Sequence, residues 1–152
     1  MVAVGRGDMH GCRLADHAAA HGREPRGVAA VAWRCACAKP GVVKTMPRLP
    51  NGTPFPTTYY LTNPQLVSAV STLEASGLMT QMSERIASDE DLAARYLAAH
   101  EAYLRDREEL GHVDEIDGIS AGGMPTRVKC LHVLVGHALA AGRGVNPIGD
   151  EA

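Results

Sequence analysis

The chain has 152 residues, of which 45% are hydrophobic and 21% are charged, close to the average of globular domains, which excludes a disordered or collagen-like protein. Aromatic residues make up only 4%, so Ala, Val and Leu must supply most of the core. The formal net charge of −2 excludes a strongly basic nucleic-acid-binding protein.

No apolar run reaches the roughly eighteen residues that a membrane span requires. The N-terminal segment mixes Arg6 and Asp8 into its Ala and Gly, so it lacks the apolar stretch of a secretory signal. We therefore expect a cytoplasmic protein whose four cysteines stay reduced. Residues 1–22 show no periodicity, and we expect a flexible tail there, followed by a single domain over residues 23–152.

Three short β-prone runs, Val28–Arg34, Val42–Thr45 and Thr57–Leu61, open this domain. Lys39-Pro40-Gly41 separates the first two, and a proline-rich connection over residues 47–56 separates the last two. The pattern predicts a three-stranded antiparallel meander.

After the third run the apolar period becomes helical. Because strands and helices do not alternate, we expect an α+β fold, a small three-stranded antiparallel meander followed by a bundle of about four helices. The predicted helices run from Thr62-Asn63-Pro64 to Gly77, from Met79 to Ile86, from Ser88-Asp89 to about Leu110, and from Met124-Pro125-Thr126 to Gly142.

Four side chains form a candidate metal site. Cys35 and Cys37 leave the same face at a strand end, and Cys130 and His132 complete four ligands for zinc or for an iron–sulfur cluster. Residues two apart on a helix point about 200° away from each other, so Cys130 and His132 can share an ion only if the helix begins late. The alternative is that the cysteines are small buried hydrophobic residues and His132 is hydrogen-bonded in the core.

Two further residues are candidates for acid–base or nucleophilic chemistry. Near a helix N-terminus, the pKa of the Cys130 thiol would be lowered, as in a catalytic cysteine. His100 shares a helical face with Tyr96, Tyr103 and Arg107, and could act as an acid–base group against Cys130 or Lys44. The alternative is a buried face whose polar tips form hydrogen bonds at its margin.

Charge is distributed unevenly along the chain, with six basic residues and one acid between Arg23 and Arg48, and eleven acids and four bases between Glu84 and Asp117. Gly122-Gly123 precedes the last predicted helix, whose first turn would contain two more cations and suit an anion. We therefore predict a site for a phosphorylated small molecule; the alternative is that the cations pair with the acidic helix. Few aromatics are available to stack bases, so we expect no nucleic-acid partner. The predicted anion-binding residues are Lys44, Arg48, Arg127 and Lys129.

Several word-like motifs, in the same order, resemble a bacterial domain-of-unknown-function family, number 501, that is common in actinobacteria. They are Arg23-Glu24-Pro25-Arg26-Gly27-Val28, the proline-rich segment over residues 47–57, Val128-Lys129-Cys130-Leu131-His132, and Asn146-Pro147-Ile148-Gly149-Asp150. The resemblance implies a small cytoplasmic protein, often encoded beside a septum-formation initiator and an exopolyphosphatase-like enzyme.

Three functions follow from these patterns. The first is a binding or adaptor protein with a protein partner, linked to cell division through its gene neighbourhood. The second is a metal-binding protein that uses Cys35 and Cys130 together with Cys37 or His132. The third is a small enzyme or sensor for a phosphorylated ligand.

Overall fold

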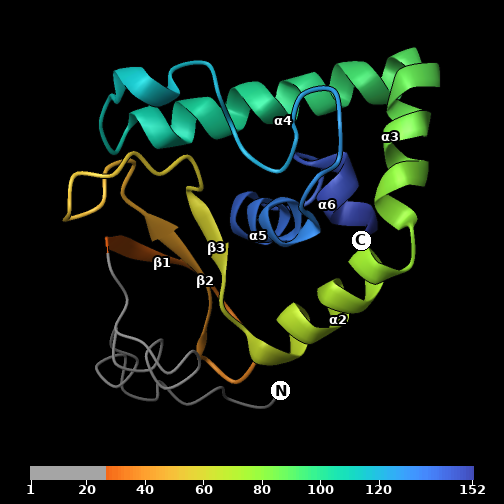
Figure 1. The fold of residues 1–152 in the computed structure, drawn as a ribbon. Helices are drawn as coiled ribbons and strands as arrows, with labels where there is room; N and C mark the ends of the chain where they lie inside the picture. Colours follow the sequence, from red (N-terminus) through yellow and green to blue (C-terminus); the bar gives the residue numbers. More distant parts are fainter. Residues whose placement is uncertain (1–26) are drawn as a thin grey trace, which may run out of the picture.

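The computed structural model describes residues 27–152 and confirms the predicted α+β fold. Its sheet is the expected antiparallel meander, in which β1 (Val28–Arg34) pairs with β2 (Pro40–Thr45) and β2 pairs with β3 (Tyr59–Leu61) (Figure 1). The tail predicted over residues 1–22 lies outside the described part of the chain.

Three helices follow the sheet close to their predicted positions: α2 (Pro64–Ala75), α3 (Leu78–Ser88) and α4 (Glu90–Glu108). The side chains of Asn63 and Asp89 cap α2 and α4, and each accepts a hydrogen bond from the backbone N–H three residues further on. These caps satisfy amides that have no partner within their own helix. Figure 1 shows the three helices as an arc that faces the sheet.

The last long helix, α5 (Leu131–Ala141), begins later than expected. The predicted start at Met124-Pro125-Thr126 is wrong, because this segment forms turns in which the Lys129 amide donates to Gly122 O (2.7 Å). That bond spans seven residues, whereas an α-helix would pair the amide with the carbonyl four residues back. A short helix that the sequence analysis did not predict, α6 (Pro147–Glu151), ends the chain.

Helix α5 lies in the centre of the fold. Figure 1 views it nearly along its axis, with the sheet on one side and α2, α3 and α4 around the others. Most of its residues from Leu131 to Ala138 are buried, so the helix has no wide polar face. Glycines permit its close contacts. A Cβ at Gly136 would lie 3.3 Å from Tyr59 O of β3, and a Cβ at Gly149 of α6 would clash with the carbonyl of Leu134.

The predicted aromatic face of α4 is buried, and its hydroxyl groups bond to the backbone. Tyr96 donates to Arg127 O (2.9 Å), while the Tyr103 hydroxyl oxygen accepts hydrogen bonds from the amides of Thr58 (2.6 Å) and Tyr59 (3.2 Å). Burial raises the pKa of both Tyr96 and Tyr103, so both stay neutral. This face therefore fixes α4 to the sheet and to the segment before α5.

Arg107 is buried on the same helix, and its guanidinium donates hydrogen bonds to backbone carbonyls. Its guanidinium reaches the carbonyls of Pro56 (3.2 Å), Ile116 (2.7 Å) and Ile119 (2.6 Å). Burial lowers its pKa, but a guanidinium stays charged in proteins. Arg107 thus joins the β2–β3 connection to the loop that contains the short 3-10 helix η1 (Asp114–Ile116).

His137 lies where α5 meets the sheet. Its ring stacks on Tyr59 with 5.4 Å between ring centroids and meets Tyr103 edge-on at 5.0 Å. Asn146 donates to His137 Nδ1 (3.2 Å), which places the ring proton on Nε2. Burial lowers the pKa of His137 to about 4, so the imidazole is neutral at pH 7.

Substitution Tyr103→Phe is expected to lower the free energy of unfolding by about 2 kcal/mol, because two backbone amides lose their buried acceptor. Urea denaturation measures the change. The exposed neighbour Tyr60 provides the matched control, and Tyr60→Phe should cost less than Tyr103→Phe because water can solvate the groups around an exposed hydroxyl. Equal effects of the two substitutions would contradict the assigned role of the Tyr103 hydroxyl.

Acidification should destabilise the protein through His137. Its pKa is about 6.5 when unfolded and about 4 when folded, so between these values the unfolded state binds more protons and stability falls as pH falls. Between pH 7 and pH 5 this loss amounts to about 2 kcal/mol. In urea denaturation across this range, His137→Gln should reduce the loss. The control variant His112→Gln should not reduce this loss of stability, because hydrogen bonds to Glu108 and Asp114 raise the pKa of the exposed His112.

Candidate metal centre

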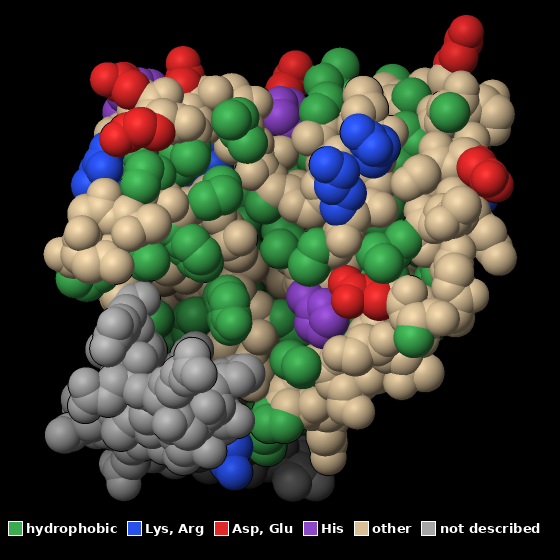
Figure 2. All heavy atoms as spheres, viewed as in Figure 1, with side chains coloured by type: hydrophobic (Ala, Val, Ile, Leu, Met, Phe, Trp, Pro, Cys, Tyr) green, Lys and Arg blue, Asp and Glu red, His purple; other side chains and the backbone are tan. Residues whose placement is uncertain are grey.

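A pocket of about 440 Å³ lies beside β3, with Val67 of α2 and Cys130, His132 and Val133 at the start of α5 in its lining. This volume is within the range of small-molecule sites, about 300–1,000 Å³. Figure 2 shows a histidine beside an acidic side chain at the surface, next to hydrophobic side chains. The pocket therefore combines an apolar lining with a small polar group.

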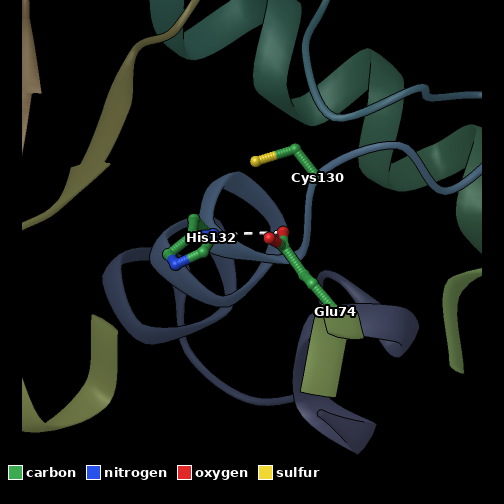
Figure 3. Close-up of side chains that lie close together, drawn as sticks. All are labelled: Glu74, Cys130 and His132. Atoms are coloured by element: carbon green, nitrogen blue, oxygen red, sulfur yellow. Dashed lines mark hydrogen bonds and ion pairs between the residues drawn. The ribbon is translucent and has the colours of Figure 1, made fainter. Parts of the chain in front are cut away.

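Cys130 and His132 of this lining lie close to Glu74 of α2, and the three residues form a polar group at the edge of the pocket. One ligand atom from each residue lies within 4.8 Å of the other two (Figure 3). Cys130 is the N-cap residue of α5 and has extended backbone angles, φ −151° and ψ 108°. Because α5 begins only at Leu131, Cys130 lies outside the helix, and the Cys130 and His132 side chains need not point about 200° apart. The late helix start that a shared ion requires is therefore present.

The ring nitrogens of His132 face oxygen atoms on both sides. Nε2 lies 3.2 Å from Val67 O and 3.2 Å from Ser71 Oγ, and the Ser71 hydroxyl itself donates to Val67 O (2.8 Å). The roles of these contacts depend on the tautomer of the ring: with its proton on Nε2 the ring donates to Val67 O, and with its proton on Nδ1 the ring accepts from the Ser71 hydroxyl at Nε2. Nδ1 lies 3.0 Å from Glu74 Oε1, so a proton on Nδ1 is donated to the carboxylate, and with the proton on Nε2 the free Nδ1 and the carboxylate together offer two ligand atoms to a cation.

The Cys130 thiol is not an activated nucleophile. Burial raises its pKa, and the charge of Glu74 adds to this effect, although the backbone amides of Val133 and His132 act in the opposite direction. The lowered pKa expected from a helix N-terminus is therefore wrong, because desolvation outweighs the helix end. A metal ion would have to displace the thiol proton.

Cys35 and Cys37, predicted as two further ligands, are joined to each other by a disulfide at the turn between β1 and β2. A disulfide sulfur is not a thiolate, so in this structure the predicted set of four is divided. Over residues 27–152 the group that could hold a metal consists of Glu74, Cys130 and His132.

The four predicted anion-binding residues lie on three segments. Lys44 on β2 has its Nζ 5.8 Å from the centroid of the Tyr59 ring, and Arg48 in the next loop forms an ion pair with Glu115 (2.7 Å). Arg127 and Lys129 are exposed and precede α5. The prediction that they lie in the first turn of the helix is therefore wrong. The site for a phosphorylated molecule stays a prediction.

His100, the candidate acid–base residue, is partly buried and has Nδ1 2.7 Å from the hydroxyl of Ser120. Burial lowers its pKa. Its hydrogen bond ties α4 to the loop before α5, which is the structural alternative that the sequence pattern allowed.

Glu74 is the residue that sequence analysis missed. It follows Val67 and Val70 at i+7 and i+4, so it occupies an apolar row of α2, and its side chain is only 24% exposed. A carboxylate at an apolar helix position was the available signal, because buried acids usually have a partner.

The fold and the site together define a small α+β protein with a thiol, an imidazole and a carboxylate gathered beside a pocket. The chain belongs to the family of proteins of unknown function DUF501, which it matches over residues 31–152, and this confirms the resemblance seen in the sequence. Neither a curated protein nor a solved structure matches the chain. No helix within residues 27–152 is long and apolar enough to cross a membrane. The cytoplasmic location and the septum-linked partner stay predictions.

Removing the charge of Glu74 should lower the pKa of the Cys130 thiol. In metal-free protein, we expect Glu74→Gln to shift the midpoint of the pH–rate profile for Cys130 alkylation to lower pH. At a fixed pH below the pKa, lowering the pKa by one unit raises the thiolate fraction by a factor of about ten. Peptide-level mass spectrometry of iodoacetamide labelling measures the profile. Glu84→Gln on the exposed side of α3 is the control, and an unchanged midpoint in Glu74→Gln would contradict this account.

Proposed function

We propose that this protein binds a zinc ion through Glu74, Cys130 and His132, at the edge of the pocket beside β3. The observation that carries this proposal is the 3.0 Å approach of His132 Nδ1 to Glu74 Oε1. With Nε2 directed to Val67 O, the ring presents its other nitrogen to a carboxylate. A cation in place of the intervening proton satisfies both atoms, and the Cys130 sulfur lies within 4.8 Å of them.

The chemistry of the three ligands favours zinc. Thiolate, imidazole and carboxylate are its three usual protein ligands, and a ligating histidine usually donates its other N–H to a carboxylate, a backbone carbonyl or water. Val67 O takes that role for His132, and the Leu131 amide donates to Glu74 Oε1 (2.7 Å), which orients the carboxylate. Ligands of tetrahedral zinc lie about 3.3–3.8 Å apart, so His132 Nδ1 and Glu74 Oε1, now 3.0 Å apart, need to separate by a few tenths of an ångström, and the Cys130 sulfur needs to approach by about 1 Å at most. An iron–sulfur cluster is less suitable because it needs several thiolates.

Three protein ligands leave zinc with an open coordination position. The pocket adjoins the ligands and has the size of a small-molecule site, so the open position would be available to a bound ligand. A metal-dependent binding protein is thus the function that these residues support best, and it joins the expected binding role to the expected metal.

Metal-free protein should take up one equivalent of zinc, and Cys130→Ser, His132→Gln and Glu74→Gln should each weaken the affinity at least about tenfold. Elemental analysis gives the stoichiometry, and competition with a chromophoric chelator gives the affinity. Because the metal displaces the Cys130 proton, the affinity should fall as the pH is lowered. Cobalt(II) should show a thiolate charge-transfer band that is lost in Cys130→Ser.

Two matched variants control for other metal-binding side chains. Cys12→Ser removes a cysteine outside the described residues, and His112→Gln removes an exposed histidine that contacts two acids. Both should bind zinc like the wild type. Zinc uptake that is insensitive to Cys130→Ser and His132→Gln, or no uptake at micromolar zinc, would reject the proposal.

A further inference from the structure

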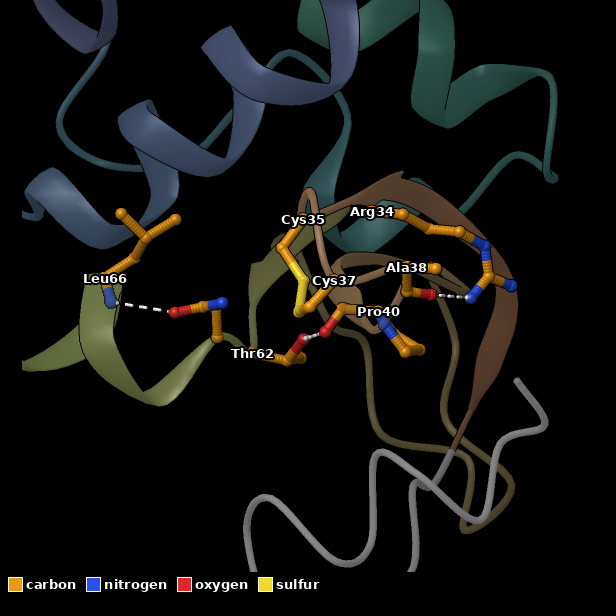
Figure 4. Close-up of a disulfide and its surroundings, with 8 residues drawn as sticks. Arg34, Cys35, Cys37, Ala38, Pro40, Thr62 and Leu66 are labelled. Atoms are coloured by element: carbon orange, nitrogen blue, oxygen red, sulfur yellow. Dashed lines mark hydrogen bonds between the residues drawn. A yellow bond between two sulfur atoms is a disulfide. The ribbon is translucent and has the colours of Figure 1, made fainter. Parts of the chain in front are cut away.

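The disulfide between Cys35 and Cys37 occupies an unusual position for a structural crosslink. It lies at the β1–β2 turn, near Pro40 and Thr62 (Figure 4), and joins residues with a sequence separation of 2. Closing so short a loop removes little entropy from the unfolded chain, so the crosslink contributes less stability than one that closes a long loop.

The turn is also closed without the disulfide. The Cys35 amide donates to Lys39 O (3.0 Å), the Ala38 amide donates to Cys35 O (2.9 Å), and the Arg34 guanidinium donates to Ala38 O (3.0 Å). The backbone path of the hairpin therefore has its own support when the sulfur–sulfur bond is broken.

The two sulfurs differ in how readily a thiol can approach them. As residues, Cys37 is exposed and Cys35 is partly buried, which favours attack at Cys37 with Cys35 as the leaving group. Lys39 follows the pair by two residues and adds a positive charge to this turn. Cations beside a thiol stabilise the thiolate, and a better leaving group accelerates exchange.

We propose that Cys35 and Cys37 form a redox site that exchanges with low-molecular-weight thiols and disulfides. A thiolate attacks Cys37 Sγ, the Cys35–Cys37 bond breaks, and Cys35 leaves as a thiolate while a mixed disulfide remains on Cys37. A second thiol attacks the mixed disulfide at the sulfur of the first, which releases Cys37 and one oxidised disulfide molecule. Two external thiols are thereby oxidised to a disulfide, and the Cys35–Cys37 disulfide is reduced to two thiols. The reverse steps reduce an external disulfide and oxidise Cys35 and Cys37 to their disulfide. This site is independent of the zinc proposal.

Full-length protein equilibrated anaerobically in buffers of reduced and oxidised glutathione, with a chelator present, tests this proposal. Free thiols are blocked by alkylation, and the tryptic peptide over residues 35–44 is analysed by mass spectrometry; it contains Cys35 and Cys37 and no other cysteine. We expect the peptide to pass reversibly between its disulfide and dithiol forms as the glutathione ratio changes, while circular dichroism shows that the protein stays folded. A peptide that remains a disulfide, or remains a dithiol, at every ratio overturns the proposal.

A matched pair of variants tests the point of attack. With oxidised glutathione, Cys35→Ser should form a glutathione adduct on Cys37 at least about tenfold faster than Cys37→Ser forms one on Cys35. Equal rates would reject Cys37 as the sulfur that external thiols reach. The wild-type titration stands without either variant, so a variant that fails to fold does not affect its result.

Discussion

The central position of α5 places the polar start of a helix in the interior, where its backbone amides need partners. Glu74 of α2 meets this requirement at Leu131, the first residue of the helix, through the 2.7 Å bond to its amide. A carboxylate is the favoured partner there, because the unpaired amides and the helix dipole both attract negative charge. The same carboxylate faces His132, so the group that holds the helix end is also the group that assembles the candidate metal centre.

Scarcity of aromatic residues shapes the rest of the interior. Tyr59, Tyr96 and Tyr103, three of the four tyrosines, are buried, and their hydroxyl groups all find partners. Tyr59 donates to Asp106 (2.6 Å), so the large side chains that fill the core also join α4 to the sheet and to the segment before α5. The core therefore relies on directional hydrogen bonds as well as on apolar contact, which favours one arrangement of the helices over others.

Strong local signals at their ends make some elements predictable from the sequence. Asn63-Pro64 and Asp89 marked the starts of α2 and α4, because a capping side chain and an N-terminal proline act within one turn. The sequence is insufficient where distant contacts decide, since the segment over residues 124–130 contains helix-compatible residues that are held in turns by bonds to Gly122 and Ser83. Glu74 was missed for the same reason, because its partners lie on α5, nearly sixty residues away.

Arg107 holds the middle of the loop before α5 and therefore influences how that part of the loop can open. One guanidinium holds Ile116 O, Ile119 O and Pro56 O, so release of this side chain frees all three carbonyls together. The stretch from Ile116 to Ile119 should therefore open as one cooperative unit, with amides that exchange hydrogen at a common rate set by an opening smaller than global unfolding.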